Sequence, residues 1–156
     1  KQLTRDQVEK QVDGAGPGML SHMLSSCDAT LPKSPIAFEI AKGWMASKDP
    51  VRRSCGYGLV YELAKDKKDE RLTDEFFLGC VEKIGKTIAK EENRVRVGMG
   101  GALMSIGKRN KKLNAAAIKL AKAIGPIHFS DGDRKCEPMN VLKHLTSDYL
   151  RNKLGR

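Results

Sequence analysis

Apolar residues along this chain recur every three to four positions, which is the spacing of one face of an α-helix. A clear stripe with steps of four residues consists of Val51, Cys55, Leu59 and Leu63. The alternation of apolar and polar residues that marks a half-buried strand is nearly absent. The pattern therefore predicts an all-α protein.

Helix-start signals divide the chain into segments. Side chains that accept hydrogen bonds from the first N–H groups of a helix precede the apolar stripes, and two of them stand directly before proline. The predicted N-caps are Thr4, Ser34, Asp49, Thr73, Asn93 and either Asn110 or Asn114. Gly125 and Pro126 end the helix that follows Asn110 or Asn114, and a last helix is expected within residues 139–155.

Two of these segments are copies of one pattern. A shift of 95 − 51 = 44 residues places Val51 over Val95, Arg52 over Arg96 and Gly56 over Gly100. A period of this length with two helices per unit is typical of HEAT and armadillo arrays. We therefore expect residues 1–156 to form a single HEAT-like α-α solenoid, with degenerate units before residue 35 and after residue 113.

Glycines interrupt both copies. Gly56 and Gly58 each cost about 1 kcal/mol relative to alanine within a helix, so a close approach is expected there. The approaching group is either a neighbouring helix or the backbone of a ligand.

Arginines at the start of the segment 51–68 raise a second question, because the helix dipole disfavours positive charge there by about 0.3–1 kcal/mol per residue. Arg52 and Arg96 belong to the repeat, and pairing with a capping acid such as Asp49 explains them. Arg53 has no counterpart, since Val97 stands at the matching position. An anion is expected near Arg53, and the candidates are Asp28, Asp49 or a phosphate.

Basic residues also cluster near the ends of the two copies. The net charge is 29 − 19 = +10, which raises the expectation of a polyanionic partner over a generic basic surface. The clustered residues are Lys65, Lys67, Lys68, Lys108, Arg109, Lys111 and Lys112. Stacked repeats would align them as a ridge able to follow a phosphate backbone, although solvated helix ends carry lysine as well.

The sequence carries few signals for disulfides, metal sites or membrane spans. The four cysteines form no C-x-x-C pair, which suits a reducing cytosol and small buried thiols. His22 and Cys27, or His128, Cys136 and His144, match no zinc spacing, so we expect no metal and no cofactor. No apolar run reaches the roughly 18 residues of a membrane span.

Four blocks in order carry a family resemblance: LSHMLSSCD, GWMASKDPVRRSCGYGL, NRVRVGMGGALMSIGKRN and IGPIHFSDGDRKCEP. Together they resemble the bacterial DNA alkylation repair family, the AlkD-type HEAT-like alkylpurine DNA glycosylases, over about residues 3–145. The resemblance implies a right-handed superhelix with a basic concave face that cradles double-stranded DNA. It also implies additional N-terminal helices, so we expect this chain to be the C-terminal portion of a longer member.

The resemblance assigns roles to particular residues. Asp28 matches the aspartate that stabilises the cationic sugar, and Arg53 matches an arginine near the DNA backbone, with Arg52 as the alternative register. The active-site tryptophans are not matched, since Leu24 and Gly101 stand in their places. Trp44 matches a structural tryptophan instead. The aromatic wall would then fall to Tyr57 and Tyr61, which we count with Arg52, Arg96 and the basic ridge as DNA-binding candidates.

The sequence thus predicts a DNA-binding HEAT-like protein, cytoplasmic and monomeric, that associates with the nucleoid when bound to alkylated or distorted DNA. Excision of N3- or N7-alkylated purines is the catalytic version of this hypothesis. The alternative is a non-catalytic helical-repeat scaffold that binds an acidic protein or RNA.

Overall fold

The structure is a computed structural model that describes residues 3–26, 29–131 and 134–155. The longer helices are α1 (Arg5–Ala15), α3 (Ala37–Met45), α4 (Pro50–Leu63), α5 (Asp74–Thr87), α6 (Asn93–Gly107) and α7 (Lys111–Ile124). Shorter elements are α2 (Met19–Leu24), η1 (Leu31–Lys33), η2 (Ile88–Lys90), β1 (Ser130–Asp131), β2 (Arg134–Lys135), α8 (Val141–Leu145) and α9 (Asp148–Leu154). The predicted all-α architecture is confirmed, with one small antiparallel β1–β2 pairing added.

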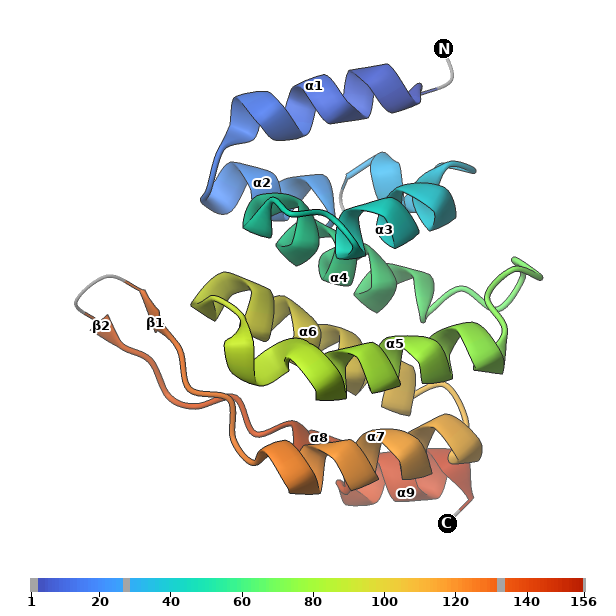
Figure 1. The fold of residues 1–156 in the computed structure, drawn as a ribbon. Coiled ribbons are helices and arrows are strands. Elements are labelled where there is room, and N and C mark those ends of the chain that lie inside the picture. Colours follow the sequence, from blue (N-terminus) through green and yellow to red (C-terminus); the bar gives the residue numbers. More distant parts are fainter. Residues whose placement is uncertain (1–2, 27–28, 132–133, 156) are drawn as a thin grey trace.

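The helices stack as successive antiparallel pairs from α1 to α9 (Figure 1). The second helices of the pairs pack in series, α2 on α4, α4 on α6 and α6 on α8, while α3, α5 and α7 cover one side of this layer. The pairs α3–α4 and α5–α6 are the two copies predicted from the sequence, and α4 and α6 share the most extensive contact. No helix in the described part of the chain is long and apolar enough to cross a membrane.

Several predicted helix starts are confirmed by their capping bonds. The Thr4–Gln7 capping box is complete, and Asp49 accepts a hydrogen bond from the Val51 N–H at 2.9 Å. Thr73 caps α5 through the Phe76 N–H at 3.2 Å. Of the two candidates before α7, Asn110 is the cap, through the Leu113 N–H at 2.9 Å.

Two predicted caps are wrong by one or more residues. The turn after Ser34 is not yet α-helical, so α3 begins at Ala37 with Ile36 at the N-cap position. Asn93 is the first residue of α6, and Glu92 occupies the N-cap position without a side-chain capping bond. The Asn93 side chain is used elsewhere, because its Nδ2 donates to Ser130 Oγ at 3.0 Å.

The predicted last helix is two short helices. Thr146 ends α8, and the Ser147 side chain accepts from the Leu150 N–H to start α9. The Ser147 side chain thus caps a new helix at a point where the sequence pattern predicted one continuous helix. The polar segment 129–138 contains β1 and β2, and the backbones of Ile127 and Met139 exchange hydrogen bonds at its base.

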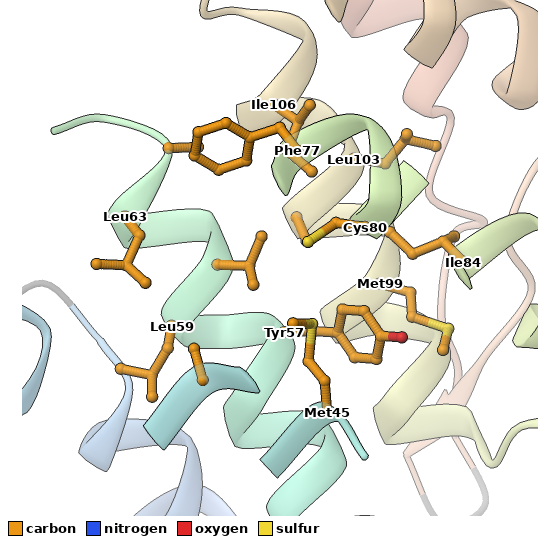
Figure 2. Close-up of a cluster of buried hydrophobic side chains, with 14 of the residues drawn as sticks. Met45, Tyr57, Leu59, Leu63, Phe77, Cys80, Ile84, Met99, Leu103 and Ile106 are labelled. Atoms are coloured by element: carbon orange, nitrogen blue, oxygen red, sulfur yellow. The ribbon is translucent and has the colours of Figure 1, made fainter. Parts of the chain in front are cut away.

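The core lies between the two layers. Figure 2 shows Leu59 and Leu63 of α4, Phe77, Cys80 and Ile84 of α5, and Met99, Leu103 and Ile106 of α6 in one cluster. Trp44 is also buried, as the resemblance implied, and its Nε1 donates to Glu9 Oε1 at 3.0 Å.

The need for glycine at position 56 is explained by the packing of α4 on α3. A Cβ at this position would lie 2.7 Å from the Met45 backbone nitrogen and 3.0 Å from the Trp44 carbonyl carbon. Real carbon atoms do not approach backbone so closely, so α3 and α4 can touch only with glycine here. Of the two readings of this glycine, helix-on-helix packing is confirmed.

Candidate nucleic-acid interface

Arg52 holds the start of α4 against α1. Its guanidinium donates to Glu9 Oε2 at 3.0 Å, to Asp49 Oδ2 at 2.9 Å and to Asp13 Oδ1 at 2.7 Å. These bonds, with the side chain of Asp13 contributing most, hold the pKa of Arg52 above its ordinary value. Three carboxylates more than offset the unfavourable position of a cation at a helix start. Pairing with the capping acid was one predicted explanation for Arg52, and the structure shows that pair.

Arg53 is fixed just as fully. Its Nε and Nη2 form a fork with the two oxygens of Glu91, at 2.9 and 2.8 Å. Its Nη1 donates to the carbonyls of Ser47 and Lys48 at 3.1 and 2.8 Å. The Arg53 and Glu91 side chains are only 20% and 11% exposed. The guanidinium therefore joins the α3–α4 turn to the segment before α6, and the anion expected beside Arg53 is Glu91, which the sequence did not suggest.

The start of α6 has a different arrangement. Arg96 donates through Nη2 to the Asn93 amide oxygen at 2.7 Å, and its buried Nε has no hydrogen-bond partner among the described residues. The pairing of Arg96 with Asp49 that the repeat suggested is not present among the described ion pairs. No carboxylate of the described chain therefore neutralises Arg96.

Arg94 is the residue that the sequence reasoning missed. It is exposed at the first turn of α6, and its side chain makes no hydrogen bond or ion pair within the described residues. A signal was available, because the shifted copy places Pro50 at its position, so Arg94 is as singular in the repeat as Arg53.

Tyr57 lies in the core and not on an open face. It is 0% exposed and points among residues of α5 and α6 in Figure 2. Burial raises the pKa of Tyr57 to about 12, which the neighbouring Thr87 side chain offsets only in part. Its hydroxyl has no partner of hydrogen-bonding geometry among the described residues. A direct DNA contact by Tyr57 does not fit this position, because α5 and its side chains cover the face of α4 that carries it.

Tyr61 is the aromatic side chain that reaches the seam between α4 and α6. It is half-buried, and its Cδ2 would lie 3.7 Å from a Cβ added at Gly101. Lys65 lies over the ring, with Nζ 4.3 Å from its centroid, and also bonds to Glu62 at 2.8 Å. Tyr61 therefore provides an aromatic surface beside the position where the family resemblance expects a tryptophan.

Arg109 in the predicted basic ridge has a structural role. Its guanidinium donates to the carbonyls of Ala64, Asp66 and Leu72 and lies 4.8 Å from the Phe77 ring centroid. It thereby satisfies carbonyls that follow the end of α4 and one that precedes the start of α5. The same bonds bring the end of α6 against the end of α4.

The lysines of the ridge differ in whether their side chains form an ion pair. Lys112 lies 3.8 Å from Glu75, and both side chains are largely exposed, so this pair contributes little. The exposed lysines whose side chains make no hydrogen bond or ion pair within the described residues are Lys67, Lys68, Lys108 and Lys111. Because Arg109 joins the two helix ends, these four positive charges lie along one edge of the stack.

The remaining candidates add no catalytic cluster to the described structure. Asp28 and Cys27 lie outside the described residues. Burial raises the pKa of the Cys55 thiol to about 11 and that of Cys80 to about 12, so both thiols are kept protonated. Within residues 3–26, 29–131 and 134–155, no group of three or more His, Cys, Asp or Glu side chains could hold a metal ion.

These elements define a helical-repeat protein in which pairs of antiparallel helices stack around a continuous core. The chain belongs to the DNA alkylation repair enzyme family, whose model matches residues 10–128.

Relatives match nearly the whole chain. Lin0241 of Listeria innocua is 22% identical over 153 residues, and Lmo0209 of Listeria monocytogenes is 22% identical over 151 residues. A solved structure described as a new family of proteins related to the HEAT-like repeat DNA glycosylases with affinity for branched DNA structures superposes with a TM-score of 0.85 and 24% identity. The alignments cover 97–98% of this chain but 64% of each relative. The fold is therefore HEAT-like, and the chain spans about two thirds of its relatives' length.

Proposed function

We propose that this protein binds DNA through the edge and seam of α4 and α6. The observation that carries the proposal is the group of exposed lysines where these helices end, because Lys67, Lys68, Lys108 and Lys111 have no acidic partner in the described structure. A row of such charges attracts phosphates without reading sequence. Membership of the DNA alkylation repair family and the net charge of +10 support the same partner.

The affinity for branched DNA that is described for the structural neighbour suggests which DNA to use. We therefore extend the proposal to distorted DNA, with junctions bound at least as tightly as duplex. Fluorescence anisotropy with a four-way junction, a duplex of the same sequence and a single-stranded RNA, each over a series of salt concentrations, tests both steps.

The expected result is tight binding of junction and duplex at low salt, with an affinity that falls steeply as salt increases. Each phosphate contact that forms releases condensed counterions and contributes about −0.9 to the slope of log K against log salt for duplex DNA. Failure to bind either DNA at low salt contradicts the proposal. Preference for RNA, or for an acidic protein added as competitor, supports the scaffold alternative.

Base excision is the catalytic version of the proposal and depends on Asp28 and Arg53. A carboxylate such as Asp28 can stabilise an oxocarbenium-like sugar, as in glycoside hydrolysis. The bonds of Arg53 to Glu91, Ser47 and Lys48 use four of its five N–H donors, so this guanidinium can offer DNA more than one donor only if a bond opens. Release of N7-methylguanine from a methylated duplex, compared between the native chain and Asp28→Asn, is the test. Equal release by both proteins removes Asp28 from the reaction, and no release by either leaves DNA binding without excision.

A further inference from the structure

The starts of α4 and α6 differ in how much positive charge remains for a ligand. At α4, the guanidinium groups of Arg52 and Arg53 donate to Glu9, Asp13, Asp49 and Glu91. At α6, Arg96 donates to an amide and Arg94 to no described residue. The acidic side chain in the same turn is Glu92, which is exposed. Arg94 and Arg96 together outweigh it by one positive charge.

Arg94 also begins the solvent-facing stripe of α6. Steps of three or four residues from Arg94 reach the half-buried Val97, Gly101 and Met104 and then the exposed Lys108. Lys108 is one of the four exposed lysines where α4 and α6 end. One helix thus presents a cation at each end of the same stripe, roughly 20 Å apart for a rise of 1.5 Å per residue.

The middle of this stripe is half-buried and lies directly beside α4. The Ser54 hydroxyl donates to the Arg94 carbonyl at 3.3 Å, and the Ser105 hydroxyl donates to the Tyr61 carbonyl at 2.7 Å. Between these bonds, Gly98 lies against the Ser54 carbonyl and Gly101 against the Tyr61 ring. Gly98 and Gly101 carry no side chain at the seam, so a phosphate backbone that runs from one cation to the other would pass over these glycines and over the half-buried Val97 and Met104 of the same stripe.

We propose that Arg94 binds a backbone phosphate of DNA and that Lys108 marks the opposite end of the same contact path along α6. This inference rests on the proposed DNA-binding function and assigns its helix-start contact to α6, where Arg94 is free, and not to the paired arginines of α4. Arg96, held by Asn93, supports the positive potential at this position.

The test is a salt titration of junction and duplex binding by the native chain, Arg94→Gln, Arg94→Lys and Arg151→Gln. Arg151 is an exposed arginine of α9 whose nearest described carboxylate, Asp148, is 3.7 Å away, so its substitution removes the same charge at another place. Arg94→Gln is expected to reduce the steepness of log K against log salt by about 0.9. Arg94→Lys and Arg151→Gln are expected to keep the native slope.

Three results overturn the inference. One is a native slope for Arg94→Gln, another is an equal loss for Arg151→Gln, and the third is a loss for Arg94→Lys as large as that for Arg94→Gln. Thermal unfolding of Arg94→Gln should match that of the native chain, because the side chain is exposed and makes no described bond. If the native chain binds neither DNA at low salt, the proposed function itself fails and this contact fails with it.

Discussion

At the start of α4, two arginines bind four carboxylates. At the matching start of α6, Arg96 binds one amide and the Arg94 side chain binds no described residue. The two helices are copies of one repeat pattern, with apolar residues at equivalent positions, and they pack against each other. The difference shows that a repeat can conserve a helix while it changes what the charges of that helix do. In α4 the charges connect neighbouring turns, and in α6 no carboxylate of the described chain pairs with them.

The partners of α4 come from distant parts of the chain. Glu9 and Asp13 belong to α1, and Glu91 follows η2. Arg52 and Arg53 therefore tie three consecutive helix pairs together at one end of the stack. In a solenoid, where each unit touches only its neighbours, such ties add directly to the interface free energies that hold the array together.

The largest difference between the two helix starts is expected in stability. Arg53→Met leaves Glu91 unpaired at 11% exposure and removes the donors of the Ser47 and Lys48 carbonyls. We expect it to lower the free energy of unfolding by about 2–3 kcal/mol. Arg94→Met, the same change at α6, should stay within about 0.5 kcal/mol of native. Urea unfolding of the two variants measures both, and equal losses would contradict the assigned roles.

The glycines of the two copies should differ next. Gly56→Ala places a methyl group 2.7 Å from the Met45 backbone nitrogen, while a methyl at the equivalent Gly100 meets the side-chain ends of Ile127 and Met139. Side-chain ends can move and backbone cannot. After the gain in helix propensity, we expect a net loss of about 1–2 kcal/mol for Gly56→Ala and a smaller one for Gly100→Ala. Thermal unfolding should show that order, and the reverse order would contradict this account of the packing.

The caps provide a third contrast. Asp49 accepts from the Val51 N–H, whereas Glu92 makes no side-chain capping bond. Asp49→Ala should therefore cost about 1 kcal/mol, and Glu92→Ala only a few tenths. A larger loss for Glu92→Ala would show that α6 is capped by its side chain after all.

The cap of α4 should also depend on pH. Burial raises the pKa of Asp49, but the bonds from Val51 and Arg52 outweigh it and leave the pKa below its ordinary value. A lowered pKa means that the ionised form stabilises the fold fully above about pH 3.9. This contribution is lost as the pH falls through the folded-state pKa. The stability difference between native and Asp49→Ala should therefore shrink in acid, and a constant difference would contradict the charged cap.

The smallest effect is expected at Tyr57, whose counterpart in α6 is Gly101. Its hydroxyl is buried without a described partner, so Tyr57→Phe removes a polar group that gains nothing from burial. The variant should be as stable as the native chain or slightly more stable, and its DNA affinity should be unchanged. A loss above about 1 kcal/mol would show that the hydroxyl is hydrogen-bonded.

The sequence predicted the features that depend on local patterns. The Thr4 and Asp49 caps and the 44-residue shift follow from such patterns. So does the apolar stripe of Val51, Cys55, Leu59 and Leu63, of which Val51 is half-buried and the other three are buried. The sequence could not predict Glu91 as the partner of Arg53, 38 residues away, because that pair forms only when two turns of the stack meet.

Errors in the predicted site have the same origin. Tyr57 shares four-residue spacing with Arg53 and Tyr61, and only the placement of α5 shows that it is covered. The absence of a repeat counterpart distinguished Arg53 from the arginines that recur in the repeat. It did not show whether Arg53 pairs with an acidic residue of the protein itself, as it does with Glu91. The same criterion, applied to the second copy, would have selected Arg94.

The reactivity of individual arginines in the native chain tests the central claim most directly. Modification with an arginine-specific dicarbonyl, read by mass spectrometry with and without junction DNA, reports each guanidinium separately. We expect Arg94 to react in the free protein and to be protected by DNA, while Arg52 and Arg53 react slowly in both states. Rapid reaction of Arg53 in the free protein with protection by DNA, and no protection of Arg94, would contradict the account.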